Sequence, residues 1–274
     1  MTLEARGLTL TYDKHTVVDG LDLALPAGQI TAIVGANGCG KSTLLRGLSR
    51  VLRPHAGAVL LDGADLRSMH PKQVARRVAL LPQHPVAPGG MTVTELVGLG
   101  RHPHQGALRP RNRDDDRIVA EAMEATDTVE LADRPVEELS GGQRQRVWIA
   151  MVLAQRTEVL LLDEPTSFLD LAHAVDVLDL VTDLNHERGT TVAMVLHDLN
   201  LAARYATHLV AVKQGRIVAE GTPAQVITAE RVQDVFGMGC AVVPDPVTGT
   251  PLVVPIGRHH LTFAASSAFG PTAA

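Results

Sequence analysis

A glycine-rich segment near the N-terminus has the spacing of a phosphate-binding loop. Residues 35–42 read GANGCGKS and match the pattern G-x-x-x-x-G-K-[ST] in full. Glycines let successive backbone N–H groups point at one phosphate chain, and a following helix adds its positive N-terminus. Lys41 can reach the β- and γ-phosphates, and the Ser42 hydroxyl can bind Mg²⁺. A plain glycine-rich turn is the alternative, but an apolar run before the loop and a helical run after it favour a nucleotide site.

Two neighbouring carboxylates end an unbroken apolar run and could supply the rest of a hydrolytic site. Residues 159–162 read VLLL, and Asp163 and Glu164 follow them directly. A buried strand of this kind would deliver Asp163 to its exposed end, where the carboxylate can hold Mg²⁺. Glu164 can then accept a proton from an attacking water. Two acids that merely end a strand in solvent are the alternative, which the upstream phosphate loop disfavours.

A third segment offers a second anion site elsewhere in the chain. Residues 139–146 read LSGGQRQR, in which Ser140, Gly141 and Gly142 open a helix whose free N–H groups can face a phosphate. The sequence has one phosphate loop and one such helix start. If each nucleotide needs both, two copies must pair head to tail. An ordinary N-cap with a flexible glycine pair would explain this segment taken alone, but not its occurrence with the other two.

Short β-type runs alternate with helical runs around these segments, which predicts α/β architecture. We expect strands at residues 8–12, 21–25, 29–34, 58–62, 78–82, 159–163 and 191–196 and helices at residues 41–50, 114–126, 142–155 and 171–188. Turns are expected at Gln214-Gly215 and Thr248-Gly249. Residues 85–113 are rich in Pro, Gly, His and Arg and precede helical periods, so we expect a helical insertion at about residues 88–157.

The bulk composition limits the function classes. A net charge of −5 argues against nucleic acid as the main partner. Cys39 and Cys240 are the two cysteines, which excludes a disulfide framework or a Cys-rich zinc site and fits a reducing compartment. The N-terminus lacks a signal-peptide pattern, and no run approaches the ~18 apolar residues of a membrane span. We expect a soluble chain with one domain at residues 1–257 and a disordered tail of small residues at 258–274.

Together, LSGGQRQR, the phosphate loop and VLLLDEP resemble the ATP-binding cassette (ABC) ATPases, and the resemblance spans residues 3–256. It implies a P-loop ATPase core with an antiparallel β subdomain and an inserted helical subdomain, acting as a homodimer on ATP and Mg²⁺. It also implies that Tyr12 stacks on adenine and that Gln83 contacts Mg²⁺ and water. Asp170 would belong to a loop that crosses the dimer, and His197 would touch the γ-phosphate.

Each of these smaller assignments has a structural alternative. Tyr12 could be a half-buried strand residue, Gln83 could cap a strand, His197 could be structural, and Asp170 could be a helix N-cap. With the resemblance, the expected catalytic residues are Lys41, Gln83, Glu164 and His197. The expected metal ligands are Ser42, Gln83 and Asp163. The expected ATP contacts are Tyr12, Gly35, Asn37, Gly38, Cys39, Gly40, Lys41, Ser42, Thr43, Ser140, Gly141, Gly142, Gln143 and Asp170.

Further segments resemble the iron–siderophore importer ATPases, close to the ferric enterobactin type. They read MTVTELV (91–97), GRHPH (100–104), RDDDR (113–117), LADRPV (131–136), WIAMVLAQ (148–155), HDLNLAARYA (197–206) and DPVTGTPLVVP (245–255). The resemblance implies an ATPase subunit peripheral to the cytoplasmic face of the cell membrane. Transmembrane permease subunits would dock on the helical insertion, and a solute-binding protein would be an indirect partner.

Three other functions are weighed against this one. Cobalamin and haem importers share the architecture and are the alternatives for the transported solute. A soluble ABC ATPase of DNA repair, chromosome structure or translation is the rival class, which the lack of a long coiled coil, zinc modules and a second cassette disfavours. A nucleotide-binding regulator without hydrolysis is opposed by the presence of both Glu164 and His197.

Overall fold

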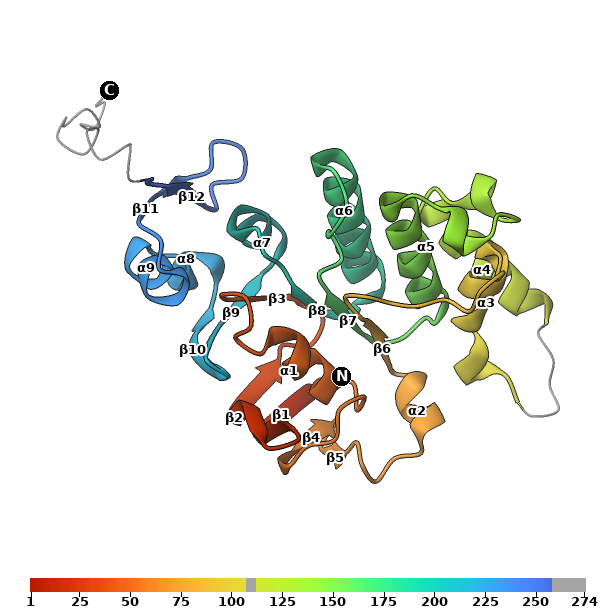
Figure 1. Ribbon diagram of the computed structural model, residues 1–274, viewed down its shortest axis with the longest axis horizontal. Coiled ribbons are helices and arrows are strands. Elements are labelled where there is room, and N and C mark those ends of the chain that lie inside the picture. The colour runs from red at the N-terminus through yellow and green to blue at the C-terminus, as the bar shows by residue number, and fades with distance from the viewer. Residues whose placement is uncertain (107–111, 258–274) are drawn as a thin grey trace.

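A mostly parallel sheet forms the centre of the protein, for which a computed structural model describes residues 1–106 and 112–257 (Figure 1). Its strand order is β10-β9-β3-β8-β7-β6. The bounds are β3 (Ile30–Val34), β6 (Val78–Leu81), β7 (Val159–Asp163), β8 (Thr191–Val195), β9 (His208–Lys213) and β10 (Arg216–Gly221). All but β10 run parallel, and β10 pairs antiparallel with β9 through the predicted turn at Gln214-Gly215. β3, β7 and β8 are buried at every residue, as strands covered on both faces must be.

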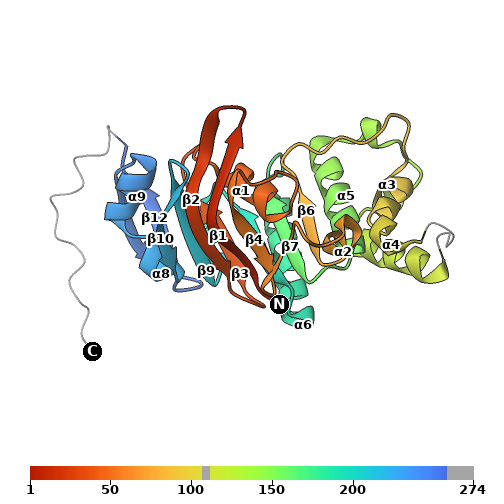
Figure 2. The ribbon, with the colours of Figure 1, turned by 90° about the horizontal axis from the view of Figure 1, so that it is seen from below.

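A second, antiparallel sheet has the order β2-β1-β4-β5. Its strands are β1 (Leu3–Tyr12), β2 (His15–Leu25), β4 (Ala56–Leu61) and β5 (Ala64–Asp65). The first two are longer than the predicted strands because alternate burial already begins at Leu3. Helix α1 (Lys41–Leu48) shares one apolar cluster with this sheet and the central one, through Leu44, Leu45 and Leu48 (Figure 2). The expected helix to residue 50 ends earlier because Arg50 adopts a left-handed φ of 65°.

Three helices pack together beyond β6, in the region predicted to be a helical insertion (Figure 1). They are α3 (Val93–Leu99), α4 (Arg113–Ala125) and α5 (Gly141–Ala154), with 3-10 turns at His102–His104, Val129–Leu131 and Val136–Glu138. The helices expected at 114–126 and 142–155 are present within a residue at each end. α3 was not predicted as a helix, although Thr92 and Glu95 form a capping box at its start.

The remaining helices flank the central sheet and the C-terminal end. They are α2 (Pro71–Ala75), α6 (Leu171–Arg188), α7 (Leu199–Tyr205), α8 (Pro223–Val226) and α9 (Ala229–Phe236). α6 has the predicted bounds, with Asp170 as N-cap and Gly189 at its C-terminal end in a left-handed conformation. A final hairpin of β11 (Cys240–Pro244) and β12 (Pro251–Pro255) turns through Gly249, as expected. The predicted tail at 258–274 lies outside the described residues.

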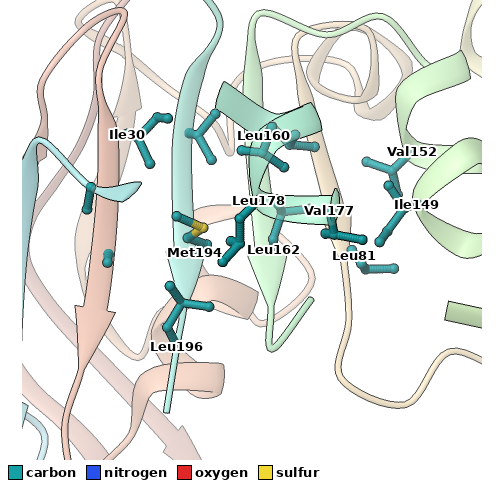
Figure 3. Packing of buried hydrophobic residues seen from close by; sticks show 14 of the residues in the cluster. Ile30, Leu81, Ile149, Val152, Leu160, Leu162, Val177, Leu178, Met194 and Leu196 are labelled. Atoms are coloured by element: carbon teal, nitrogen blue, oxygen red, sulfur yellow. The ribbon is translucent and has the colours of Figure 1, made fainter. Parts of the chain in front are cut away.

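The main core is aliphatic. Figure 3 shows Leu178 of α6 packed on Leu162 and Met194 of the central strands, with Ile149 and Val152 of α5 near Leu81. This packing joins the strand that ends at Asp163 to α5 and α6, so the positions of the polar residues at the strand ends are rigidly defined. None of the helices in the described residues is long and apolar enough to span a membrane.

Candidate functional site

The predicted phosphate loop connects β3 to α1 and is packed tightly against β9. A Cβ atom added at Gly35 would lie 2.2 Å from the carbonyl oxygen of Val212, so no larger residue fits there without moving the backbone. Gly40 has φ 107° and is the N-cap of α1, a conformation that favours glycine. The glycine spacing is therefore required by two separate constraints, a close approach and a left-handed cap.

Lys41 folds its side chain back over this loop. Its ammonium group donates hydrogen bonds to the carbonyl oxygens of Gly35 at 2.8 Å and Ala36 at 2.9 Å, and the residue is only 5% exposed. Because these acceptors are neutral carbonyls, the positive charge is not cancelled by a carboxylate at this point. The ammonium is thus held inside the loop with its charge available to an anionic ligand.

Asp163 and Ser42 form a polar pair where β7 meets the loop. The Ser42 hydroxyl donates to Asp163 Oδ1 at 2.9 Å. Asp163 is 1% exposed, and its second oxygen, Oδ2, is buried without a hydrogen-bond partner in the described part of the chain. Burial raises the pKa of Asp163. A buried carboxylate oxygen without a partner costs free energy unless a cation or donor binds there.

These residues fit Mg²⁺. Mg²⁺ is usually held by one or two carboxylates, waters and substrate phosphates rather than by a full protein cage. Across residues 1–106 and 112–257 no group of three or more His, Cys, Asp or Glu side chains is placed to hold a metal. The unpartnered oxygen of Asp163 next to the Ser42 hydroxyl instead has the chemistry of a partial donor set, which nucleotide phosphates and waters would have to complete.

Glu164 has a strained backbone and a firmly held side chain. Its φ of 56° is unusual for a residue other than glycine and is typical of functional positions. Ser167 Oγ donates to Glu164 Oε2 at 2.9 Å, and His197 Nε2 lies 2.6 Å from Glu164 Oε1. Burial alone would raise the pKa of Glu164, but hydrogen bonds from His197, Ser167 and Gln83 outweigh it and hold the pKa below its ordinary value. The carboxylate is therefore ionised at neutral pH.

A pocket of about 430 Å³ brings these segments together. It is lined by Val17, Asn37, Gly38, Gly40, Lys41, Ser42, Thr43, Gln83, Glu164 and His197. The loop after β3, the ends of β6 and β7 and the end of β8 all contribute, as expected for ligand sites at the carboxyl ends of parallel strands. Sequence reasoning missed Val17, whose signal is weak because it is one valine in an ordinary alternating strand.

Several expected ligand residues do not line this pocket: the expected metal ligand Asp163 at the end of β7, the LSGGQ residues and Asp170, and the three residues Tyr12, Gly35 and Cys39. Gly35 and Cys39 lie in the loop behind it, and Cys39 is buried. Tyr12 lies at the end of β1, is 40% exposed and accepts a hydrogen bond from Arg46 Nη1 at 3.1 Å. Adenine stacking on Tyr12 therefore stays a prediction.

The LSGGQ segment occupies a different place on the surface. Ser140, Gly142, Gln143 and Asp170 line a second pocket of about 340 Å³, which shares no lining residue with the first. Ser140 caps α5 in a reciprocal capping box, in which its side chain accepts from Gln143 N at 3.3 Å and Gln143 Oε1 accepts from Ser140 N at 3.1 Å. The phosphate loop and the LSGGQ segment therefore lie at two separate pockets of one chain.

Asp170 has the structural role that its sequence context allows. Its carboxylate accepts from His173 N at 2.9 Å and lies 2.8 Å from His173 Nδ1, as an N-cap of α6. The backbone hydrogen bond from His173 lowers the pKa of Asp170. A contact of Asp170 with a nucleotide or a second subunit stays a prediction.

The fold and the phosphate-loop pocket are those of a nucleotide-binding cassette, and comparison with known proteins agrees. The family model described as "ABC transporter" matches residues 18–167, more than half of the chain. The chain therefore belongs to the ABC transporter family, as a cassette that binds ATP and hydrolyses it. Membership of this family implies a cassette that works as a dimer with permease partners.

The similar proteins include several ATP-binding subunits of importers. The ferric enterobactin transport ATP-binding protein FepC of Escherichia coli is 53% identical over 256 residues, covering 93% of this chain and 94% of its own. A probable siderophore transport ATP-binding protein, YusV of Bacillus subtilis, is 52% identical over 92% of this chain and 91% of its own. A bacterial cassette solved as a post-hydrolysis dimer with ADP and phosphate superposes with a TM-score of 0.73 at 27% identity, covering 80% of this chain and 98% of that one.

Proposed function

We propose that this chain is the ATP-hydrolysing subunit of an importer that carries ferric siderophores across the cytoplasmic membrane. The observation that carries the proposal is its 49–53% identity, over more than nine-tenths of the chain, with subunits named for ferric enterobactin, achromobactin, petrobactin and iron–hydroxamate transport. Hemin import subunits are 44% identical over similar coverage. The position of the chain would be peripheral, at the cytoplasmic face of the membrane.

We infer the following roles at the nucleotide site. Residues of the loop 35–43 would bind the phosphates, with Lys41 neutralising the β- and γ-phosphate oxygens. Ser42, Asp163 and Gln83 would hold Mg²⁺, which when bound supplies positive charge to the same phosphate oxygens. The hydroxyl at 2.9 Å from Asp163 and the unpartnered Asp163 oxygen support this assignment.

Glu164 and His197 would carry the hydrolytic step. An ionised Glu164 can accept the proton of a water whose oxygen attacks the γ-phosphorus. The bond from the γ-phosphorus to the β–γ bridging oxygen then breaks, and ADP and phosphate leave. His197 would orient Glu164 and contact the γ-phosphate, and its 2.6 Å approach to Glu164 Oε1 supports this pairing.

Two copies would complete each site. The separation of the two half-sites in one chain supports a head-to-tail homodimer, in which Ser140, Gly141 and Gly142 of one copy face the γ-phosphate held by the other.

We propose that residues 1–257 form the ATPase domain and that the insertion at about 88–157 receives the permease. Gln83, at the end of β6, lies between the nucleotide pocket and that insertion and would link nucleotide state to permease conformation.

Uptake in cells tests the solute assignment. A strain lacking this chain, complemented with wild type or with Glu164→Gln, is expected to take up radiolabelled ferric enterobactin only with the wild-type copy. Haem and labelled cobalamin uptake should be equal in all strains. Loss of haem or cobalamin uptake with unchanged siderophore uptake would support the role as an importer ATPase but overturn the assigned solute. If no uptake changed, the importer proposal would be wrong and the soluble class of ABC ATPase would be favoured.

A further inference from the structure

Two sequence segments are hydrogen-bonded to each other, and only His197 among their residues has an assigned role in the nucleotide site. They are HDLNLAARYA, which contains α7, and DPVTGTPLVVP, which contains β12. The Asn200 side chain accepts from Val253 N at 2.7 Å and donates to Val253 O at 3.3 Å. One amide thus satisfies both backbone groups of a residue on an edge strand, which would otherwise be left unpaired. Figure 1 shows α7 between this hairpin and α6.

A second contact between α7 and the hairpin lies one helical turn further along α7. Arg204 Nε donates to Asp245 Oδ2 at 2.8 Å, and Arg204 Nη2 lies 2.7 Å from the same oxygen in an ion pair. The Asp245 side chain is 1% exposed, and its other oxygen accepts from the backbone N–H of Val247 and Thr248. Because Asn200 and Arg204 are four residues apart, they lie on the same face of α7. The hairpin therefore contacts one face of α7 at two points, near the beginning and near the end of the helix.

His197, which was expected to touch the γ-phosphate, lies just before the N-cap of α7. Asp198 caps the helix by accepting from Asn200 N at 2.8 Å and Leu201 N at 3.0 Å. His197 directly precedes this cap, and its half-exposed ring meets the Glu164 carboxylate. The position of the ring therefore depends on the backbone at the start of α7. A seven-residue helix is marginal by itself, so its placement depends on the elements that hold it.

We propose that the C-terminal hairpin positions His197 against Glu164 through α7, with Asn200 and Arg204 as positioning residues. This inference rests on the roles proposed above for Glu164 and His197. It assigns the hairpin to the hydrolytic machinery, although no hairpin residue lines the nucleotide pocket. A shift of the histidine by about 1 Å is enough to lower a rate substantially.

The test compares Asn200→Ala with Asn185→Ala. Asn185 is a matched control because its side-chain amide also bonds a helix to backbone groups elsewhere in the fold. It is buried near the C-terminal end of α6, remote from His197, and donates to Gly28 O at 2.9 Å and Thr190 O at 2.7 Å. We expect Asn200→Ala to lower kcat about 10-fold while the affinity for a fluorescent ATP analogue changes less than about twofold, because the phosphate loop is untouched. Asn185→Ala should lower Tm as much but retain kcat.

Further variants keep the test decisive if Asn200→Ala folds poorly. Asp245→Asn removes the negative charge that pairs with Arg204 and leaves the sequence of α7 unchanged. We expect kcat to fall again while ATP affinity is retained. Wild-type kcat in folded Asn200→Ala and Asp245→Asn would overturn the inference, as would a kcat loss in Asn185→Ala that matches theirs at equal Tm. Glu164→Gln is assayed in parallel, because its retained turnover would instead remove the proposed roles of Glu164 and His197 and the inference with them.

Discussion

Replacement of Glu164 with glutamine is expected to reduce ATP turnover by about 10²–10⁴-fold, the usual contribution of a general base. Glutamine keeps the size and hydrogen-bonding shape of the side chain but cannot take a proton from water. ATP binding should persist, because the phosphate loop and the Ser42–Asp163 pair are unchanged. The ATP-bound dimer should therefore accumulate. Phosphate release measures the turnover, and size-exclusion chromatography with ATP and Mg²⁺ measures the dimer.

A matched substitution lies at the opposite end of the same strand. Glu158 directly precedes β7 as Glu164 directly follows it, and the Glu158 side chain is largely exposed beside Arg77. Glu158→Gln makes the same chemical change without touching the pocket and should leave turnover unchanged. Near-normal turnover in Glu164→Gln would show that another group activates the water, and a monomeric variant in ATP would contradict the head-to-tail dimer.

The second large effect is expected on stability, at a buried ion pair between α3 and α4. Arg101 Nε donates to Asp115 Oδ1 at 2.8 Å, and both side chains are 8% exposed. Arg101 Nη1 also donates to Ala154 O at 2.7 Å, so one guanidinium joins the ends of three helices. Arg101→Met should lower the free energy of unfolding by about 3–5 kcal/mol, because it leaves a buried carboxylate without its partner. Urea unfolding followed by circular dichroism measures it.

Two controls separate this effect from a general loss of charge. The pair of Arg117 and Glu121 on α4 is exposed to solvent and should contribute little to stability, so Arg117→Ala serves as the surface comparison. The double variant Arg101→Met/Asp115→Leu should recover much of the loss, since an apolar pair carries no desolvation cost. An Arg101→Met variant as stable as Arg117→Ala would show that water reaches the Asp115 carboxylate.

The same pair predicts a pH dependence with a defined sign. Burial alone would raise the pKa of Asp115, but the hydrogen bonds from Arg101 and Asn112 outweigh it and hold the pKa below its ordinary value. A carboxyl with a lowered folded-state pKa contributes stability above its unfolded pKa and loses it as the pH falls. Wild type should therefore lose this contribution progressively below about pH 4, whereas the Arg101→Met/Asp115→Leu variant should not.

Contiguous motifs were predictable because their chemistry and local geometry are carried by neighbouring residues. The loop 35–42 requires glycine at set positions, Ser140 and Asp170 cap helices through bonds to residues three further along, and Gly189 ends α6. Buried parallel strands reveal themselves as unbroken apolar runs, as at residues 159–163. The α/β class and the positions of Lys41 and Asp163 followed from these local signals.

Short elements and long-range contacts were not predictable in the same way. The helices α2, α7 and α8 have seven residues or fewer and depend on tertiary packing for their stability, so their local sequence carries little signal. Val17 enters the nucleotide pocket because β2 passes the loop before α1, which no periodicity of β2 indicates.

By itself, the sequence determined that this protein is an ATP-hydrolysing cassette, since each motif is a local arrangement of donors, acceptors and glycines. Only the tertiary structure decided which of those groups meet. It brought His197 to within 2.6 Å of Glu164, left one Asp163 oxygen without a partner and joined Asn200 to a hairpin 53 residues away. It also separated Ser140 from Lys41 into two pockets. Such distances are set by how strands and helices pack around a shared core, which is a property of the whole chain and of no single segment.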